Sequence, residues 1–352
     1  MTDIEHLLSL MVSKKASDLH LKVPCPPILR IDGEIKVQED LPALSGLDID
    51  QIFYSIVTLQ QKEIFEREQE LDFSYSVPGI ARFRVNALKQ RGTTSIAFRL
   101  VPIEVPTIDK LELPQILKKL VLKPRGLILV TGHTGSGKST TLAAMLNYLN
   151  ENQKCNVITI EDPVEFLHRD VKCIISQRDV GEDTHSFAAA LTHALRHDPD
   201  VLVVGEMRDL DTISAAITAA ETGHLVLGTL HTYDAPQSID RIIDVFPPIQ
   251  QNQIKIELSQ IIEAVVSQVI IPRLSGGRVV AFEIMLATPA VRNLIREGKL
   301  NQLHSVMQTA SKDGMQILNQ SLADLVKGQV ISEVEAIQKS SYPEQLIGFL
   351  NQ

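Results

Sequence analysis

The stretch Gly132-His133-Thr134-Gly135-Ser136-Gly137-Lys138-Ser139 constrains the fold more than any other part of the chain. It lies between an apolar run, residues 126–131, and residues 140–146, whose pattern is typical of a helix. A glycine, four free positions and Gly-Lys-Ser between a strand and a helix form the pattern of a phosphate-binding loop. A turn between a strand and a helix can also need glycines for its geometry alone, but the Lys-Ser pair at this offset favours phosphate binding.

The residue types of this loop suit the phosphates of a nucleotide. Glycines let backbone N–H groups curl around phosphates, and the N-terminus of the following helix adds partial positive charge. We expect Lys138 to reach the outer phosphates and the Ser139 hydroxyl to bind magnesium, so ATP and Mg²⁺ are the expected cofactors. The residues predicted to contact the nucleotide are Gly132, Thr134, Gly135, Ser136, Gly137, Lys138, Ser139 and Thr140.

Apolar runs alternate with helical patterns beyond the loop, which predicts a parallel sheet with crossover helices. In open α/β sheets, ligands bind beyond the carboxyl ends of the strands. Polar residues follow each run, so we expect these residues to meet at one site. The runs are 127–131, 157–160, 201–204 and 225–228, and the polar stretches are the loop, Glu161–Glu165, Gly205–Asp209 and Thr229–Thr232.

Hydrolysis of a nucleotide needs magnesium, a carboxylate that positions or deprotonates water, and positive charge on the phosphate oxygens. Glu206 follows the run 201–204 and is the best candidate carboxylate, whereas Gly205 stands where such sites often have an aspartate for magnesium. Glu206 can share these roles with nearby acids, each of which can instead be a surface or helix-capping residue. Those acids are Glu161, Asp162 and Glu165, and the predicted metal ligands are Ser139, Asp162 and Glu206.

Two histidines, His224 and His231, bracket the fourth run. They are seven residues apart and would point to opposite faces of a continuous strand, which argues against a shared metal. Each can be a hydrogen-bonded core residue, a solvated residue or a packing residue. The more specific interpretation is that His231 contacts the terminal phosphate or its neighbours and that His224 braces the site.

Arginines offer the positive charge that hydrolysis needs. Arg196, Arg208 and Arg241 follow the phosphate loop in the chain and can act within the subunit. Segments 81–87 and 95–100 alternate like strands, with arginines on one face or edge. That pattern fits either a half-buried antiparallel sheet with solvated arginines or a phosphate-facing role in which the arginines come from the first domain or a neighbouring subunit. The arginines are Arg82, Arg84 and Arg99.

A chain of 352 residues is long enough for two or three domains. Four prolines between Val101 and Pro124 predict a linker and a short helix. We therefore predict an N-terminal domain over residues 1–100 that begins with a helix at 4–12, a linker over 101–118, and a second domain over 119–352. Its C-terminal portion, from about 270, is predicted to be largely helical, with helices at 254–269, 289–297 and within 307–350, a turn at 276–277 and a short strand at 279–285.

Composition narrows the class of protein. An apolar content of 44% and a charged content of 22% are those of a soluble globular protein. No apolar run approaches the roughly 18 residues of a membrane span, and the acidic start of the chain is unlike a signal peptide, so we expect a cytoplasmic protein. The net charge of −9 and the scarcity of aromatic residues disfavour a nucleic-acid partner. Three widely spaced cysteines predict neither a disulfide framework nor a zinc site.

With these motifs, the chain resembles the PilT-like type IV pilus retraction motors of the secretion-superfamily ATPases. The similarity extends over nearly the whole chain. The similarity rests on ordered motifs rather than on the loop alone. Besides the loop, they are Ala16–Leu21, Ala81–Asn86, Ile160–Glu165, Asp198–Asp200, Gly205–Asp209, Thr222–His224, Leu230–Thr232, Ile239–Asp244 and Ala290–Glu297.

The resemblance implies a homohexamer at the cytoplasmic face of the inner membrane, in which each subunit joins a PAS-like α+β domain to a RecA-like domain of the α/β class. It implies that nucleotide binds between the two domains and that hydrolysis drives pilin disassembly and twitching motility. The implied partners are an inner-membrane platform protein of the pilus and a paralogous retraction ATPase. Arg82, Arg84 and Arg99 would then help neutralise nucleotide charge as the domains close.

The chain departs from the family pattern at a few positions. His133 stands where the loop commonly has proline, Val291 replaces isoleucine, and Tyr233-Asp234 replaces small polar residues. The segment 290–297 has an apolar stripe that any amphipathic surface helix can show, and only the resemblance makes it a candidate coupling element. Other interpretations are an assembly or type II secretion ATPase, which usually has an additional N-terminal region and a four-cysteine insert, a nucleic-acid motor, and an accessory subunit that binds nucleotide without hydrolysing it.

Overall fold

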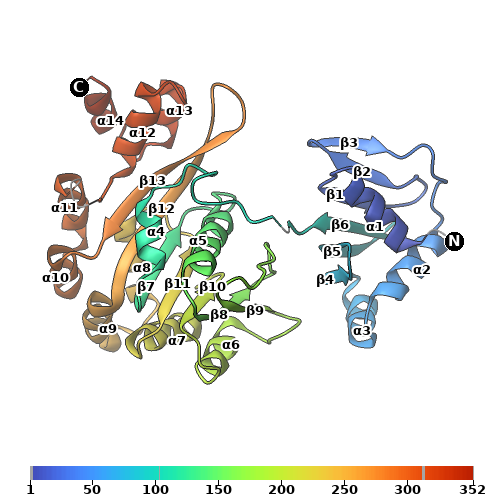
Figure 1. Cartoon of the computed structure of the whole chain (residues 1–352), viewed down its shortest axis with the longest axis horizontal. Helices are drawn as coiled ribbons and strands as arrows, with labels where there is room; N and C mark the ends of the chain where they lie inside the picture. Colours follow the sequence, from blue (N-terminus) through green and yellow to red (C-terminus); the bar gives the residue numbers. More distant parts are fainter. Residues whose placement is uncertain (1–2, 103, 311–313, 352) are drawn as a thin grey trace. The chain divides into compact units, whose positions relative to one another are not determined.

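An α+β unit and a larger unit built on a mostly parallel sheet make up the chain (Figure 1). The computed structural model describes residues 3–102, 104–310 and 314–351. The first two residues of the predicted acidic start, residue 103 of the predicted linker and residues 311–313 of the predicted helical segment lie outside that part. Unit 1 spans residues 1–104 together with Glu165–Leu167, and unit 2 comprises Val105–Val164 and residues 168–352.

Unit 1 is an antiparallel sheet with three helices and its own apolar core. The strand order is β3-β2-β1-β6-β5-β4. Phe83 and Val85 point into the core with Phe98, whereas Arg84 and Arg99 are exposed partners in the ladder, so the alternation predicted for these segments is confirmed. The elements are α1 Ile4–Ser13, β1 Asp18–Leu21, β2 Ile28–Ile31, β3 Glu34–Val37, α2 Gly46–Ile56, α3 Leu59–Glu68, β4 Glu70–Val77, β5 Ala81–Gln90 and β6 Thr93–Leu100.

Unit 2 is organised around a sheet of strand order β13-β12-β7-β11-β10-β8-β9. All neighbouring strands are parallel except β12 and β13. The four apolar runs predicted as parallel strands are confirmed as β7, β8, β10 and β11. The strands are β7 Gly126–Thr131, β8 Asn156–Glu161, β9 Ile174–Asp179, β10 Val201–Val204, β11 Leu225–Leu230, β12 Ile262–Pro272 and β13 Arg278–Leu286.

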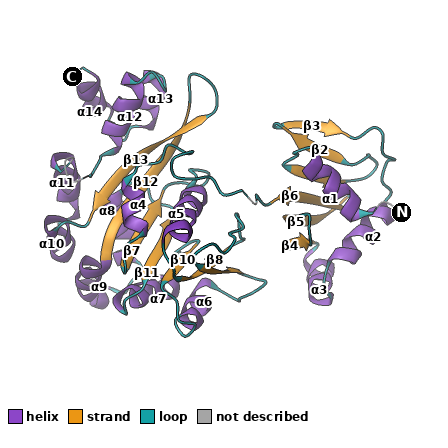
Figure 2. Ribbon diagram, viewed as in Figure 1, coloured by secondary structure: helices purple, strands orange, loops and turns teal. Residues whose placement is uncertain are grey.

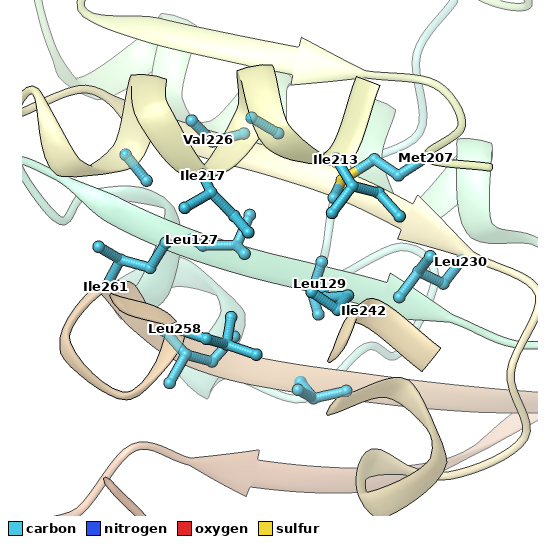
Figure 3. Close-up of a cluster of buried hydrophobic side chains, with 14 of the residues drawn as sticks. Leu127, Leu129, Met207, Ile213, Ile217, Val226, Leu230, Ile242, Leu258 and Ile261 are labelled. Carbon is cyan, nitrogen blue, oxygen red and sulfur yellow. The ribbon is translucent and has the colours of Figure 1, made fainter. Parts of the chain in front are cut away.

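Helices cover this sheet on both faces (Figure 2). Leu127 and Leu129 pack in a cluster with α7, α8 and α9 (Figure 3), and the intervening Ile128 and Val130 pack in another with α4 and α5. Burial on both faces explains why the strand sequences are continuously apolar. The helices are α4 Ile116–Val121, α5 Lys138–Asn152, α6 Phe187–Ala194, α7 Leu210–Glu221, α8 Ala235–Asp244, α9 Pro248–Ile261, α10 Pro289–Glu297, α11 Leu303–Thr309, α12 Leu318–Lys327, α13 Glu333–Lys339 and α14 Pro343–Leu350, with a 3₁₀ turn at Leu300–Gln302.

The helix predicted over 254–269 is wrong in its second half. Helix α9 ends at Ile261, and β12 begins at the next residue. Residues 264–271 are rich in β-branched valine and isoleucine, which favour a strand. Because β12 lies between β7 and β13 and is mostly buried, it has no alternating polar face that would distinguish it from a buried helix.

The predicted linker, residues 101–118, overlaps the start of unit 2. Ile108, Leu113 and Leu117 are buried in the core that α4 and α5 share. The two compact units divide at Glu104, so much of this proline-rich stretch packs within unit 2. Among the described residues, no helix is both long enough and apolar enough to cross a membrane.

One buried carboxylate joins two helix starts in unit 2. Glu283 of β13 is 4% exposed, and its Oε1 accepts a hydrogen bond from Ala235 N at 2.8 Å. The backbone N–H of Leu318 donates to the same carboxylate. Glu283 therefore caps the first turns of α8 and α12. Burial and the negative charge of Asp234 raise the pKa of Glu283 to about 7, although the two backbone hydrogen bonds act to lower it.

The raised pKa of Glu283 predicts a pH dependence of stability. Above pH 4.5 the Glu283 carboxyl of the unfolded chain loses its proton, whereas that of the folded chain keeps it up to about pH 7. The contribution of the protonated carboxyl to the free energy of unfolding is therefore complete below pH 4.5 and is lost as the pH rises to about 7. Glu283→Gln removes this titration. Relative to wild type, the variant should gain up to about 3 kcal/mol of unfolding free energy across that window and show no further change above it.

Denaturant unfolding from pH 4.5 to 8 measures this difference. Glu333→Gln, at an exposed position in the first turn of α13, is the control and should give a curve parallel to wild type. A Glu283→Gln curve that is also parallel to wild type would contradict the assignment.

Candidate nucleotide-binding and catalytic site

The loop between β7 and α5 has the backbone conformation that its glycines permit. Gly132, Gly135 and Gly137 have φ of +144°, +79° and +88°. A Cβ atom at Gly132 would lie 2.5 Å from both the Gln268 carbonyl oxygen and Ser136 Oγ, whereas one at Gly135 would meet nothing within 4 Å. Gly132 is therefore required by packing as well as conformation, and Gly135 by conformation alone.

The start of α5 has the features of a helix end that can bind an anion. Gly137 is its N-cap, and no side chain caps the first turn. Lys138 is 9% exposed, and its Nζ donates to the carbonyl oxygens of Gly132 at 2.8 Å and His133 at 3.2 Å. Uncapped N–H groups beside an ammonium group held in the loop fit the phosphates of a nucleotide. The predicted contacts Ser139 and Thr140 lie half-buried in the same turn.

A histidine, His231, connects the carboxylate of Glu206 to this loop. His231 Nε2 is 2.9 Å from Glu206 Oε1, and its Nδ1 is 3.4 Å from Thr134 Oγ1 in the loop. Burial and the nearby charge of Lys138 lower the pKa of His231. A neutral ring that donates from Nε2 to Glu206 leaves Nδ1 to accept a hydrogen bond from the Thr134 hydroxyl. The strand ends of β7, β10 and β11 therefore meet, as the sequence predicts.

Arg208 adds positive charge beside Glu206. Its Nε donates to Glu206 Oε1, and this hydrogen bond raises the pKa of Arg208. Asp162 acts on Arg208 in the same direction through its negative charge and is exposed. Glu161, at the end of β8, accepts hydrogen bonds from Thr159 at 2.7 Å and Gln177 at 3.2 Å. The acids at the strand ends thus differ, since Glu161 is held by neighbouring side chains and Asp162 faces solvent.

The residues predicted to bind magnesium carry oxygen donors of the kind that this ion takes. Mg²⁺ is usually held by one or two protein oxygens together with phosphates and water. The Ser139 hydroxyl and the carboxylates of Asp162 and Glu206 are such donors. Within the described residues, no three His, Cys, Asp or Glu side chains gather as a metal-binding group.

Several predicted residues do not join this cluster within unit 2. His224 lies at the amino end of β11, where its Nδ1 is 2.9 Å from Ala219 O and its carbonyl accepts from Gly126 N. The loop follows the opposite end of the neighbouring strand, so the predicted bracing of the site by His224 is wrong within this unit. Arg196 and Arg241 are exposed, and among the described residues no hydrogen bond or ion pair links either side chain to this cluster.

The remaining predicted residues belong to unit 1. Glu165 falls there with Phe166 and Leu167, as do Arg82 and Arg84. Arg99 donates from Nε to Asp18 Oδ1 at 2.8 Å. Burial opposes ionisation of Asp18, but hydrogen bonds from Ser17 and Arg99 outweigh it and lower the pKa of this carboxyl. Arg99 is thus held in place by a buried carboxylate.

Sequence reasoning missed one side chain that supports the loop. Gln268 of β12 donates from Nε2 to Ser136 O at 2.6 Å, and its Oε1 accepts from Thr141 Oγ1 at 2.9 Å. Gln268 is 1% exposed. The available signal was a polar amide within an apolar, β-branched run, and the assignment of this run to a helix hid it.

The chain matches the family model described as type II/IV secretion system protein over residues 1–276. It is 48% identical over 342 residues to the type IV pilus retraction ATPase PilT of Pseudomonas aeruginosa, covering 97% of this chain and 99% of that protein. It is 40% identical to the type IV pilus ATPase PilU of the same organism, covering 94% of this chain and 87% of that protein. A crystal structure of the pilus retraction motor PilT with bound ADP superposes with a TM-score of 0.92 at 46% identity, covering 99% and 100% of the two chains.

The different surroundings of two loop glycines predict different costs of substitution. Gly132→Ala must displace the Gln268 carbonyl as well as strain the backbone, so it should destabilise unit 2 by at least about 3 kcal/mol. Gly135→Ala adds strain alone and should cost about 1 to 2 kcal/mol. Urea unfolding of the two variants measures the difference, and equal losses would contradict the role assigned to the Gly132 contact.

Proposed function

Because the chain belongs to the type II/IV secretion system protein family, we propose that it is an ATP-hydrolysing motor that powers type IV pilus retraction. The observation that carries this proposal is the hydrogen-bonded series Thr134–His231–Glu206 beside Lys138. It brings a carboxylate next to a loop that fits nucleotide phosphates, which hydrolysis requires and simple binding does not. The near full-length similarity to a retraction ATPase supports the direction of work.

The side chains divide the work of hydrolysis. The loop N–H groups and Lys138 hold the outer phosphates, and Ser139 with Asp162 and Glu206 would hold Mg²⁺, which neutralises phosphate charge when bound. Glu206 positions and deprotonates the attacking water, because it is a carboxylate that His231 holds beside the loop. His231 holds Glu206 through Nε2 and contacts the loop residue Thr134 through Nδ1.

The proposed assembly follows from the family. The motor is a homohexamer at the cytoplasmic face of the inner membrane, where it acts on a platform protein of the pilus and alongside a paralogous ATPase. Arg82, Arg84 and Arg99 serve the nucleotide site from unit 1 of the same or a neighbouring subunit. Hydrolysis drives pilin disassembly and therefore twitching motility.

Removal of the Glu206 charge tests the chemistry. Glu206→Gln keeps the shape of the side chain but cannot take a proton from water, so turnover should fall at least about 100-fold while the affinity for ATP changes little. Steady-state ATP hydrolysis and equilibrium ATP binding measure the two effects. Glu333→Gln is the matched control and should hydrolyse ATP like wild type. Undiminished turnover in Glu206→Gln would contradict the catalytic role proposed for this residue.

A cellular test separates a retraction motor from an assembly ATPase or an accessory subunit. Cells that lack this chain should keep surface pili but fail to retract them, since assembly does not need a retraction motor. Imaging of labelled pili measures both properties. Loss of surface pili would indicate an assembly ATPase, and normal retraction would refute the motor.

A further inference from the structure

Strand β12 passes directly behind the phosphate loop. The Gln268 backbone oxygen occupies the space next to Gly132, since a Cβ atom there would come within 2.5 Å of it. The Gln268 side chain lies next to Gly137, where a Cβ atom would be 3.3 Å from Nε2. One residue of β12 therefore contacts the loop near its first and its third glycine.

The Gln268 amide uses both of its ends on the loop and the helix that follows. Nε2 donates to Ser136 O at 2.6 Å, and Oε1 accepts from Thr141 Oγ1 at 2.9 Å. All three residues are buried. A buried amide without partners is costly, so these bonds tie the loop and the first turn of α5 to β12.

This tie sets the direction of one loop N–H group. Ser136 O and Gly137 N belong to the same peptide unit, which is planar and trans, so its C=O and N–H point in opposite directions. Because Gln268 holds the carbonyl toward β12, the Gly137 N–H points to the side of the loop away from β12. Gln268 itself fills the side toward β12, so a phosphate can approach the loop only from the other side, toward which this N–H points.

We propose that Gln268 is a positioning residue for nucleotide binding, which holds the Ser136–Gly137 peptide so that its N–H faces the phosphates of a nucleoside di- or triphosphate. The inference rests on the proposed function, because it deepens the role of the same loop. Gln268 touches no nucleotide in this scheme and acts through the backbone. Its loss therefore weakens binding of ground state and transition state alike, which raises KM and leaves kcat nearly unchanged.

The test compares two buried amides in the full-length chain. Gln268→Met keeps the length of the side chain and removes both hydrogen bonds. Asn150→Leu is the matched control: Asn150 is 2% exposed, lies in the last turns of α5, and bonds backbone groups of Arg169, Val171 and Cys173 far from the loop. Calorimetric titration with MgADP and steady-state kinetics with ATP measure Kd, KM and kcat, and thermal unfolding measures the loss of stability.

Gln268→Met should raise the Kd for ADP and the KM for ATP about 10-fold and change kcat less than about 3-fold. Asn150→Leu should lower the melting temperature comparably and leave both constants within about 2-fold of wild type. Unchanged ADP affinity in Gln268→Met, or an equal loss in Asn150→Leu, would overturn the inference. Failure of the wild-type chain to bind ADP would refute the proposed function instead.

Two milder variants serve if Gln268→Met does not fold. Thr141→Val removes only the bond to Oε1 and should weaken ADP binding about 2- to 5-fold. Gln268→Glu removes the donor to Ser136 O at neutral pH, but a protonated carboxyl can donate again, so its ADP affinity relative to wild type should recover as the pH falls. Wild-type affinity in Thr141→Val together with a pH-independent deficit in Gln268→Glu would overturn the inference.

Discussion

The close contact between β12 and the phosphate loop is the constraint on which the rest of the site depends. Gly132 has no room for a side chain because the backbone of Gln268 lies against it. The loop begins at the end of β7, whose neighbours β11 and β12 are both parallel to it. The two neighbouring strands thus fix the point at which the loop begins, and the contact with Gln268 holds its first glycine.

The parallel sheet explains why distant segments form one site. Parallel strands end at the same edge, so the loop after β7 and the residues after β10 and β11 become neighbours although they are far apart in the chain. Glu206 and His231 reach each other in this way. These positions were predictable, because four continuously apolar runs followed by polar residues specify both the strands and the edge at which they end.

The parts that were not predictable depend on tertiary contacts. The β-branched run at 264–271 is buried on both faces, so its sequence lacks the period that separates strand from helix. The role of Gln268 was missed for the same reason. The sequence places His224 before β11 and His231 after it, but only the structure shows which side chains each ring contacts at its end of the strand. The arginines of unit 1 alternate as predicted, but alternation says nothing about which surface they face.

The side chains that support the loop and those that support His231 form one connected layer. Thr131, the last residue of β7, is 2.8 Å from Ser267 of β12 through their hydroxyl oxygens and 3.5 Å from Ser238 of α8. Ser238 in turn contacts Thr232 at 2.6 Å, directly after His231. Buried hydroxyls that satisfy one another hold a single arrangement, because displacing one leaves the next without a partner. The same layer therefore supports both the loop after β7 and His231, whose ring contacts Glu206, so packed side chains fix the position of the loop relative to this carboxylate.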